Sequence, residues 1–344
     1  MKIEGAVEFI NQAQFNAYQY AMGLVKAIKD RKGQIYINTK VEEVKKEGKK
    51  YYVIAGDYKI ECNDVVIATK YPILNFPGFH FLKMYQSTSY VIAMEVEEDD
   101  KLFSGMYIRK EEPIYSFRTA KEGEKRLLIV AGLDHKTGEE ASIEDKYKML
   151  EEKGKELYPS AKVKYKWSTQ DCISLDKIPY IGAFSNVMPN LFVATGYKKW
   201  GMTTSNIAGK ILSDKILGIE NKAAKLFCAT RLEPIKNHKE MGNMIKETVK
   251  SLIVEKLEFP KEELAEVKKG EGKIIEWEDK KIGAYRDDDN HIYLIKPVCT
   301  HLGCQLSWNH TLKTWDCPCH GSRFHYDGTL VYGPALKDLE RYEE

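Results

Sequence analysis

Apolar residues near the start of the chain recur every three or four positions, which is the spacing of one helix face. The repeating positions are Phe15, Tyr18, Met22, Val25 and Ile28. They predict a helix over residues 15–31 that ends at Lys32-Gly33, because glycine commonly terminates helices. A second helix is predicted over residues 142–157, where Ser-Ile-Glu-Asp provides a capping sequence, and a third over about 204–216.

Shorter apolar or alternating segments predict strands. Residues 51–55 and 58–62 flank Gly56-Asp57 and predict a hairpin. Residues 64–69 and 190–195 have continuous apolar centres, as in a sheet that is covered on both faces. Further strands are predicted over residues 34–41, 89–96, 105–109, 114–118, 126–130 and 161–167. The strands between residues 86 and 130 favour an antiparallel sheet of their own.

Two short motifs near the end of the chain combine cysteine with histidine. They are Cys299-Thr-His301-Leu-Gly-Cys304 and Cys317-Pro-Cys319-His320-Gly-Ser322. A [2Fe–2S] cluster with two thiolate and two imidazole ligands requires this set of side chains. The candidate ligands are Cys299 and Cys317 on one iron, and His301 and His320 on the other. Cys304 and Cys319 then remain, and they could form a disulfide if the two loops pack face to face.

Zinc is the alternative occupant, since it also binds cysteine and histidine at short spacings. Zinc fingers usually separate paired ligands by about two to five residues, whereas a single residue separates Cys299 from His301. The spacing therefore favours the iron–sulfur cluster. Imidazole ligands leave such a cluster less negative than four thiolates would, which raises its reduction potential.

Both motifs, together with Gly333-Pro334-Ala335, resemble the Rieske family over roughly residues 259–344. The resemblance implies a domain in which the Gly-Pro segment covers the cluster and Ser322 hydrogen-bonds a cluster sulfur. Many high-potential members have a tyrosine two residues after this serine, where it donates to a cysteine sulfur. This chain has Phe324 there, which cannot donate, so we expect a potential below the top of the Rieske range.

Four segments in the first two thirds of the chain resemble a flavin-binding family. They are residues 38–41, 65–72, 178–182 and 194–203. Together they resemble the FAD-dependent D-amino-acid oxidase/glycine oxidase family, in its branch with a C-terminal Rieske domain, over roughly residues 10–231. The resemblance places the Val41 backbone against adenine, and Ala68 and Thr69 beneath the cofactor. Near the flavin ring, the implied cofactor-binding residues are Gly196, Tyr197, Gly201, Met202 and Thr203.

These resemblances imply an α/β (α+β) fold class. It consists of an incomplete FAD-binding, oxidase-like domain with an antiparallel substrate-domain sheet, followed by an all-β Rieske domain. The expected domain map is residues 1–85 and 171–231 for FAD binding, 86–170 for the substrate-type sheet, 232–258 for a helical linker and 259–344 for the Rieske domain. Candidate pocket residues on the substrate-type sheet are Tyr90, Tyr107, Tyr115 and Arg118, although such residues are more often ordinary sheet residues.

The flavin family opens with a strand and a Gly-x-Gly-x-x-Gly turn that holds the FAD pyrophosphate on a helix N-terminus. This chain contains no such motif, which predicts weak FAD binding by these residues alone. Three explanations are open: a truncation, a split protein completed by a second chain that supplies the FAD unit, or a degenerate domain. The well-formed loop at residues 196–203 favours truncation or splitting.

Composition limits the partners and the compartment. The 344 residues carry a net charge of +2, so bulk charge does not favour nucleic acid as a partner. The sequence has no apolar run long enough for a membrane span and no secretory signal at its start. Three of the seven cysteines, Cys62, Cys172 and Cys228, are far apart in sequence. This usage predicts a cytoplasmic protein.

Two functions fit these observations. In the first, a flavin- and Rieske-dependent oxidoreductase passes electrons from a small amine-like or amino-acid-like substrate through FAD to the [2Fe–2S] cluster, and then to an unknown acceptor. In the second, the chain is a non-catalytic Rieske electron-transfer protein whose flavin domain is degenerate or truncated. No acid–base catalytic residue stands out in the sequence.

Overall fold

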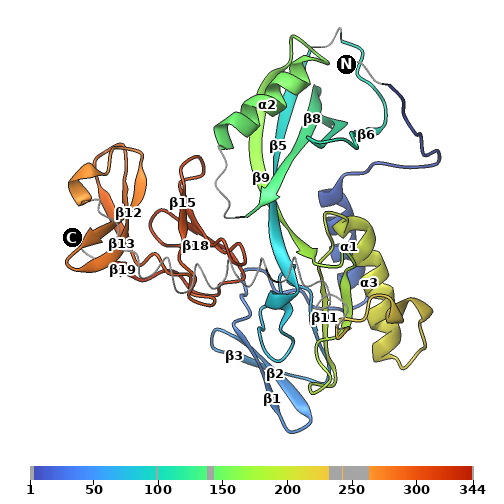
Figure 1. Cartoon of the computed structure of the whole chain (residues 1–344). Helices are drawn as coiled ribbons and strands as arrows, with labels where there is room; N and C mark the ends of the chain where they lie inside the picture. The colour runs from blue at the N-terminus through green and yellow to red at the C-terminus, as the bar shows by residue number, and fades with distance from the viewer. Residues whose placement is uncertain (1–3, 98–99, 138–142, 232–241, 243–262, 343–344) are drawn as a thin grey trace. The chain divides into compact units, whose positions relative to one another are not determined.

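The structure, a computed structural model, describes residues 4–97, 100–137, 143–231, 242 and 263–342 (Figure 1). The chain forms two compact units. The first contains Met1–Thr39, Thr88–His135 and Ala141–Thr169, and the second contains Lys40–Ser87, Lys136–Glu140 and Gln170–Glu344. The second unit therefore contains the Rieske-like segment together with flavin-type segments. The predicted domain map, which follows family resemblance, separates them. Apart from residue 242, the predicted linker over residues 232–258 lies outside the described residues.

The first unit is built on a five-stranded sheet in the order β6-β7-β8-β5-β9. Its strands are β5 (Met84–Val96), β6 (Met106–Ile108), β7 (Tyr115–Glu122), β8 (Lys125–Lys136) and β9 (Lys162–Ser174). Strand β7 pairs antiparallel with both β6 and β8, as the sequence predicted. The short strand predicted over residues 161–167 is the first part of the longer β9.

Helix α2 (Ile143–Lys155) packs on this sheet through its apolar face. Leu150 of α2 is fully buried in one core with Met94 of β5 and Val130 of β8. Gly154 permits the close approach, because a Cβ at that position would lie 2.2 Å from Met94 Sδ. The helix predicted over residues 142–157 is therefore confirmed.

Helix α1 (Ala17–Asp30) begins at Asn16, whose side chain accepts a hydrogen bond from the Gln19 N–H. None of its residues is buried. The strand predicted over residues 34–41 is wrong, since the backbone there is irregular and Ile37 is largely exposed. A strand needs a hydrogen-bonded neighbour, and no strand within the described ranges pairs with this segment.

The flavin-type part of the second unit contains two small sheets. Strands β1 (Glu43–Glu47), β2 (Lys50–Ala55) and β3 (Tyr58–Cys62) pair antiparallel and include the predicted hairpin. Strand β11 (Leu191–Thr195) pairs parallel with β4 (Val65–Ile67) and antiparallel with β10 (Tyr180–Ala183). Helix α3 (Gly201–Ile216) covers this second sheet through Ala208, Ile211 and Leu212. Like the other described helices, α3 is too short or too polar to cross a membrane.

The end of the chain is all-β, as predicted. One sheet has the order β12-β13-β14-β19 and the other has the order β15-β16-β17-β18. The strands are β12 (Gly272–Trp277), β13 (Lys280–Arg286), β14 (Ile292–Ile295), β15 (Ser307–Asn309), β16 (Thr314–Asp316), β17 (Arg323–His325), β18 (Leu330–Tyr332) and β19 (Arg341–Tyr342). Trp315 is fully buried between them, and a Cβ on Gly283 would lie 3.1 Å from its ring. This core anchors the two loops that carry the cysteines and histidines.

Candidate functional site

The two cysteine–histidine loops have the same backbone design. One connects β14 to β15 and the other connects β16 to β17. In the first, Gly303 N–H donates to the Cys299 carbonyl at 2.9 Å, and in the second Gly321 N–H donates to the Cys317 carbonyl at 2.9 Å. Both glycines have positive φ angles, which a side chain would disfavour. The loops therefore present matching sets of side chains.

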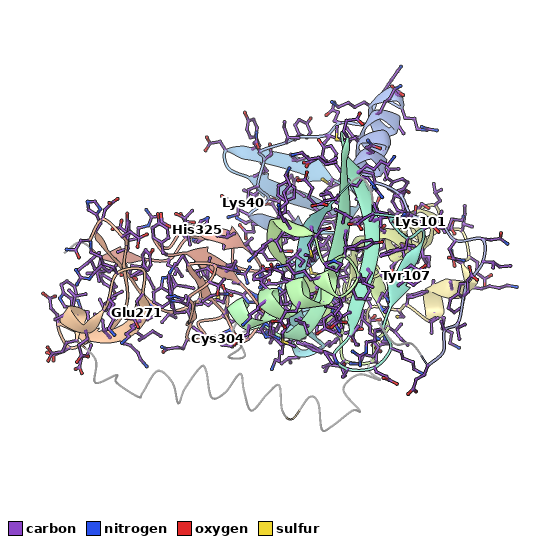
Figure 2. All side chains as sticks on the ribbon, turned by 90° about the horizontal axis from the view of Figure 1, so that it is seen from above. Lys40, Lys101, Tyr107, Glu271, Cys304 and His325 are labelled. Atoms are coloured by element: carbon purple, nitrogen blue, oxygen red, sulfur yellow. A yellow bond between two sulfur atoms is a disulfide. The ribbon has the colours of Figure 1, made fainter. Side chains whose placement is uncertain are left out.

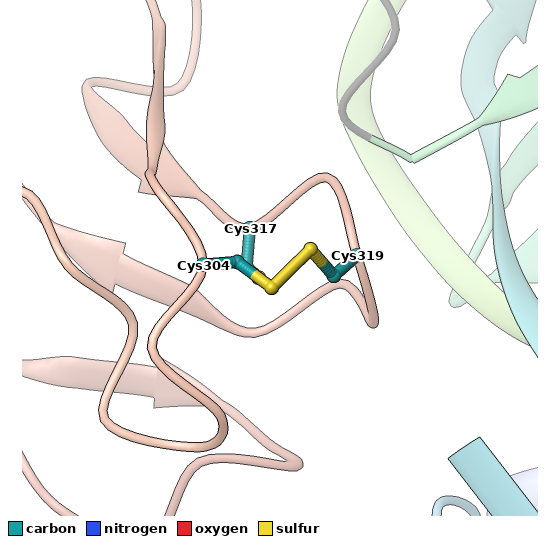
Figure 3. Close-up of side chains that lie close together, drawn as sticks. All are labelled: Cys304, Cys317 and Cys319. Atoms are coloured by element: carbon teal, nitrogen blue, oxygen red, sulfur yellow. A yellow bond between two sulfur atoms is a disulfide. The ribbon is translucent and has the colours of Figure 1, made fainter. Parts of the chain in front are cut away.

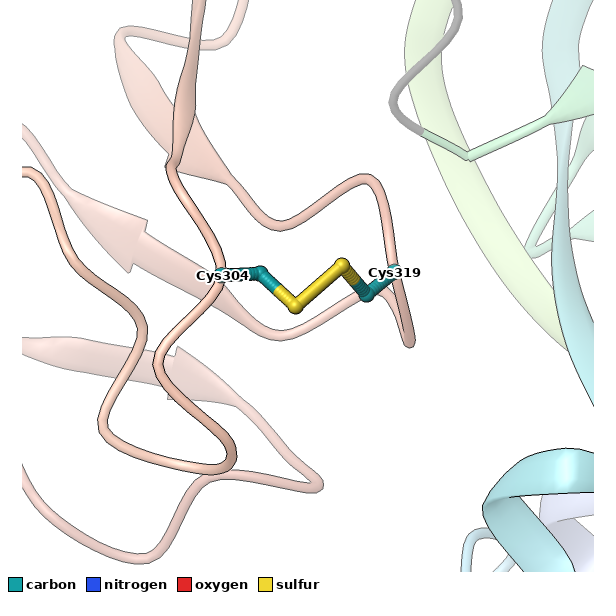
Figure 4. The surroundings of a disulfide bond; sticks show 2 residues. All are labelled: Cys304 and Cys319. Carbon is teal, nitrogen blue, oxygen red and sulfur yellow. A yellow bond between two sulfur atoms is a disulfide. The ribbon is translucent and has the colours of Figure 1, made fainter. Parts of the chain in front are cut away.

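A disulfide between Cys304 and Cys319 joins the two loops (Figures 3 and 4). Both residues are buried. Their sulfur atoms lie near that of Cys317, and these three cysteines are one group that could hold a metal ion. Because the bridge occupies two of the three sulfurs, they cannot act as thiolate ligands. Cys299 and Cys317 remain as the buried free thiols of the loops.

Cys299 and Cys317 hydrogen-bond each other. This bond lowers the pKa of the Cys299 thiol to about 7, against the effect of burial. The Ser322 hydroxyl also hydrogen-bonds Cys299 and contributes to this lower pKa. Ser322 is fully buried, and its oxygen accepts the Ala335 N–H at 2.9 Å. The serine therefore links the Gly333-Pro334-Ala335 segment to the thiol pair, where its hydroxyl can donate to sulfur.

His301 and His320 lie side by side, with ring centroids 5.1 Å apart and ring planes perpendicular. Burial lowers the pKa of His301 to about 4 and that of His320 to about 3, so both rings are neutral at pH 7. The Nδ1 atom of each ring is buried and has no hydrogen-bond partner. A buried polar atom without a partner is costly, and a metal ligand bond would satisfy both. This donor set fits the Rieske cluster.

The arrangement does not fit a single zinc ion. Four ligands around one zinc would place their donor atoms about 3–4 Å from one another. Within the described residues, one group of three potential metal ligands has donor atoms within 4.8 Å of one another, namely Cys304, Cys317 and Cys319. It contains neither histidine. Two thiols and two imidazoles held as separate pairs match a cluster with two irons better than one ion.

The sequence-predicted flavin residues lie around the end of two parallel strands. Val193 of β11 is in register with Ile67 of β4, so Ala68 and Thr69 leave the sheet on the same side as Gly196. Ala68 and Thr69 are exposed, and Gly196 is buried with a positive φ. Val41 precedes β1 and packs against the same core as β4. The structure therefore brings these segments together around one sheet.

Helix α3 begins beside this strand end, at Gly201, Met202 and Thr203. No side chain caps its first turn, so the N–H groups there remain available to a ligand. The preceding loop holds Lys198 and Lys199 in left-handed conformations that are strained for lysine. Burial raises the pKa of Tyr197 to about 12. The free N–H groups at the start of α3 could hydrogen-bond the polar edge of a flavin. No pattern in the sequence indicates the strained φ angles before them.

Residues 2–215 match the family described as DAO, FAD dependent oxidoreductase. The chain belongs to this FAD-dependent oxidoreductase family. Residues 258–343 match the Rieske [2Fe-2S] domain. A DAO domain and a Rieske domain in one chain imply both cofactors, FAD and a [2Fe–2S] cluster, and confirm the fold class expected from the sequence.

Individual relatives agree with this assignment. The Rieske 2Fe-2S iron-sulfur protein YhfW of Bacillus subtilis is 35% identical over 334 residues, which are 97% of this chain and 65% of that protein. Glycine oxidase from Geobacillus kaustophilus has a similar fold, with a TM-score of 0.51 and 19% identity over 61% of this chain and 57% of that one. L-proline dehydrogenase from P. horikoshii has a TM-score of 0.53 and 13% identity over 63% and 59%. The chain spans less than two thirds of each.

In the Rieske domain, His301 and His320 pack against the segment of the DAO domain that follows β4. Tyr71 is buried, with its ring centroid 6.0 Å from those of His301 and His320. Gln86 Nε2 donates to the His320 carbonyl at 2.7 Å. A Cβ on Gly321 would lie 3.0 Å from the Gln86 side chain, so this contact is close. Sequence reasoning missed Tyr71 and Gln86, because no local pattern links them to the cluster loops.

The candidate substrate residues have different environments. Tyr90 and Tyr115 are almost fully buried in the apolar core of the first unit, and the Tyr90 hydroxyl bonds His135 Nε2 at 2.7 Å. They pack in this core and do not line an open pocket. Tyr107 lies half exposed on β6 (Figure 2). Arg118 has a buried Nε without a partner, so it remains the stronger candidate of the four.

Phe324 is fully buried in the core that contains Cys299 and Cys317. Its ring supplies no hydrogen-bond donor to either sulfur. Hydrogen bonds to the sulfurs raise the reduction potential of such clusters. A potential below the top of the Rieske range therefore remains our prediction.

Proposed function

We propose that the chain is a flavin–Rieske oxidoreductase acting on a small amine or amino-acid-like substrate. Cys299 and Cys317 are the proposed thiolate ligands of the cluster, and His301 and His320 are its proposed imidazole ligands. When bound, FAD accepts a hydride from the substrate and the cluster carries single electrons onward. The chain holds the two sites in position and keeps water from the cluster, and its two neutral imidazole ligands add no negative charge to it.

One contact carries this proposal. Tyr71 lies two residues after the proposed flavin residue Thr69 in the sequence and packs against both candidate histidine ligands. Thr195, at the end of β11, donates its hydroxyl to the Lys70 carbonyl and so ties the flavin loop to the same segment. The proposed flavin site and the cluster thus share one short, packed stretch of chain. This arrangement supports electron transfer between them.

A Rieske electron-transfer protein with an inert flavin domain is the second candidate. Exposed apolar side chains at the start of the chain favour it: Tyr18, Met22 and Ile28 of α1 and the preceding Phe15 are all exposed. Ala68 and Thr69 are exposed as well. For the first candidate, we propose that a further FAD-binding unit, supplied by a partner chain or by more of the same polypeptide, completes the flavin site around Ala68 and Thr69.

Anaerobic mixing with substrates distinguishes the two candidates. FAD-supplemented protein is mixed with a panel of small amines and amino acids that includes glycine and L-proline. The proposed enzyme should lose its flavin absorbance with at least one of them and gain the EPR signal of the reduced cluster. Unchanged flavin with every member, in protein whose cluster is intact, would favour the inert-domain candidate. A chain that fails to bind FAD would favour the completed-site arrangement, and the panel is then repeated with the partner present.

A further inference from the structure

We propose that Asn75, a residue of the DAO domain, is a positioning residue that sets the reduction potential of the Rieske cluster through ligand His301. This inference rests on the proposed ligand set and adds a residue outside the Rieske domain to the cluster's control. Asn75 Oδ1 lies 2.6 Å from His301 Nε2, although 226 positions separate the residues in sequence. This distance is shorter than the usual 2.9–3.0 Å.

The direction of the hydrogen bond follows from the ligand atom. His301 Nδ1 is buried without a partner and is the atom available to iron. A neutral imidazole that binds metal through Nδ1 carries its proton on Nε2. His301 Nε2–H therefore donates to the Asn75 side-chain oxygen, which takes the place of the carboxylate, backbone carbonyl or water that usually accepts from a metal-bound histidine.

The loop that carries Asn75 is well supported. The Phe79 N–H donates to the Asn75 backbone carbonyl at 2.9 Å and closes a turn. The rings of Phe76, Phe79 and Phe81 pack together within this loop, with centroid separations of 5.1 Å, 5.7 Å and 6.1 Å. A supported loop holds the amide in one orientation, so the His301 ring has a fixed acceptor.

His320 has a different partner. The backbone carbonyl of Phe81 hydrogen-bonds its ring, and a backbone group cannot be altered by substitution. Asn75 is therefore the side chain, within the described part of the chain, through which the DAO domain hydrogen-bonds a ligand imidazole. A change at Asn75 alters one ligand and leaves the other with its own acceptor.

The expected effect on the potential has a clear sign. An acceptor on Nε2–H makes the imidazole a stronger electron donor to iron. Stronger donation favours the oxidised, more positive cluster and lowers the reduction potential. Asn75→Leu removes the acceptor at similar size and should raise the potential. Asn75→Asp replaces it with a negative acceptor and should lower the potential.

An EPR-monitored redox titration of the full chain at one pH tests the proposal. For Asn75→Leu we expect about a tenfold change in the equilibrium constant for reduction, which is about 59 mV upward for a one-electron couple. Asn75→Asp should move the potential in the opposite direction. Gln86→Met is the matched control, because Gln86 bonds the His320 backbone and no ligand nitrogen. Its potential should remain near that of the parent.

Two results would overturn the role of Asn75. One is an unchanged potential in Asn75→Leu with an intact cluster signal, and the other is a shift of the same sign in both Asn75 variants. Pulsed EPR with nitrogen-15 histidine gives a second measurement, in which Asn75→Leu should change the coupling of one remote ring nitrogen and not the other. A parent protein without a Rieske signal would instead contradict the proposed ligand set, so the two failures are distinguishable.

Discussion

Changing Cys317 to serine is expected to abolish the cluster. Cys317 is the buried free thiol beside the Cys304–Cys319 bridge, and it hydrogen-bonds Cys299. Serine keeps the size of the side chain but gives iron a poor ligand in place of a thiolate. We expect the purified variant to lose its visible cluster absorbance, its EPR signal on reduction and nearly all of its iron.

Cys172→Ser is the matched control for this loss. Cys172 is also a buried free cysteine, but it lies in the core around β4 and β11, and burial raises the pKa of its thiol to about 12. It stays protonated and plays no part in binding iron, so its variant should keep the cluster. Full iron content and an unchanged spectrum in Cys317→Ser would contradict the proposed ligand set.

Removal of the disulfide is expected to destabilise the Rieske domain without removing the cluster. Cys304 and Cys319 are 15 positions apart, and closing a loop of this length stabilises a domain by about 3 kcal/mol. The double variant Cys304→Ala with Cys319→Ala keeps all four proposed ligands. Its cluster should form, and its free energy of unfolding should fall by about 3 kcal/mol.

Denaturant unfolding, followed by the visible absorbance of the cluster, measures this difference. The double variant Cys62→Ala with Cys228→Ala changes the same number of cysteines at positions with no bridge, and it should unfold near the parent. A loss below about 1 kcal/mol in the bridge variant would show that the cluster alone holds the loops together. If the bridge variant fails to assemble a cluster, the disulfide is needed to bring the two loops into contact before the cluster forms.

The cluster loops could be predicted from the sequence because their chemistry is local. All the candidate ligands lie between Cys299 and His320, and each loop folds on its own glycine turn. The continuous apolar residues predicted both β4 and β11, but the expected cover on both faces holds for β11 and not for β4, where Val66 is exposed. These features depend on neighbouring residues and need no knowledge of the rest of the fold.

The remaining features depend on distant contacts. Asn75 reaches His301 across 226 positions, and no pattern around Asn75 indicates a metal site. The strand expected over residues 34–41 has good strand residues but no neighbour in the described structure, and propensity cannot supply one. Tyr90 and Tyr115 resembled pocket residues because alternation on a strand does not distinguish a core face from a binding face.

In the proposed enzyme, FAD and the cluster exchange electrons within one chain. Rapid-freeze EPR after photoreduction of the flavin, in FAD-loaded protein at two concentrations, tests it most directly. We expect the signal of the reduced cluster to appear as the flavin is reoxidised, at a rate that does not change with protein concentration. A reduced flavin beside a cluster that stays oxidised, or a rate that rises with protein concentration, would contradict it.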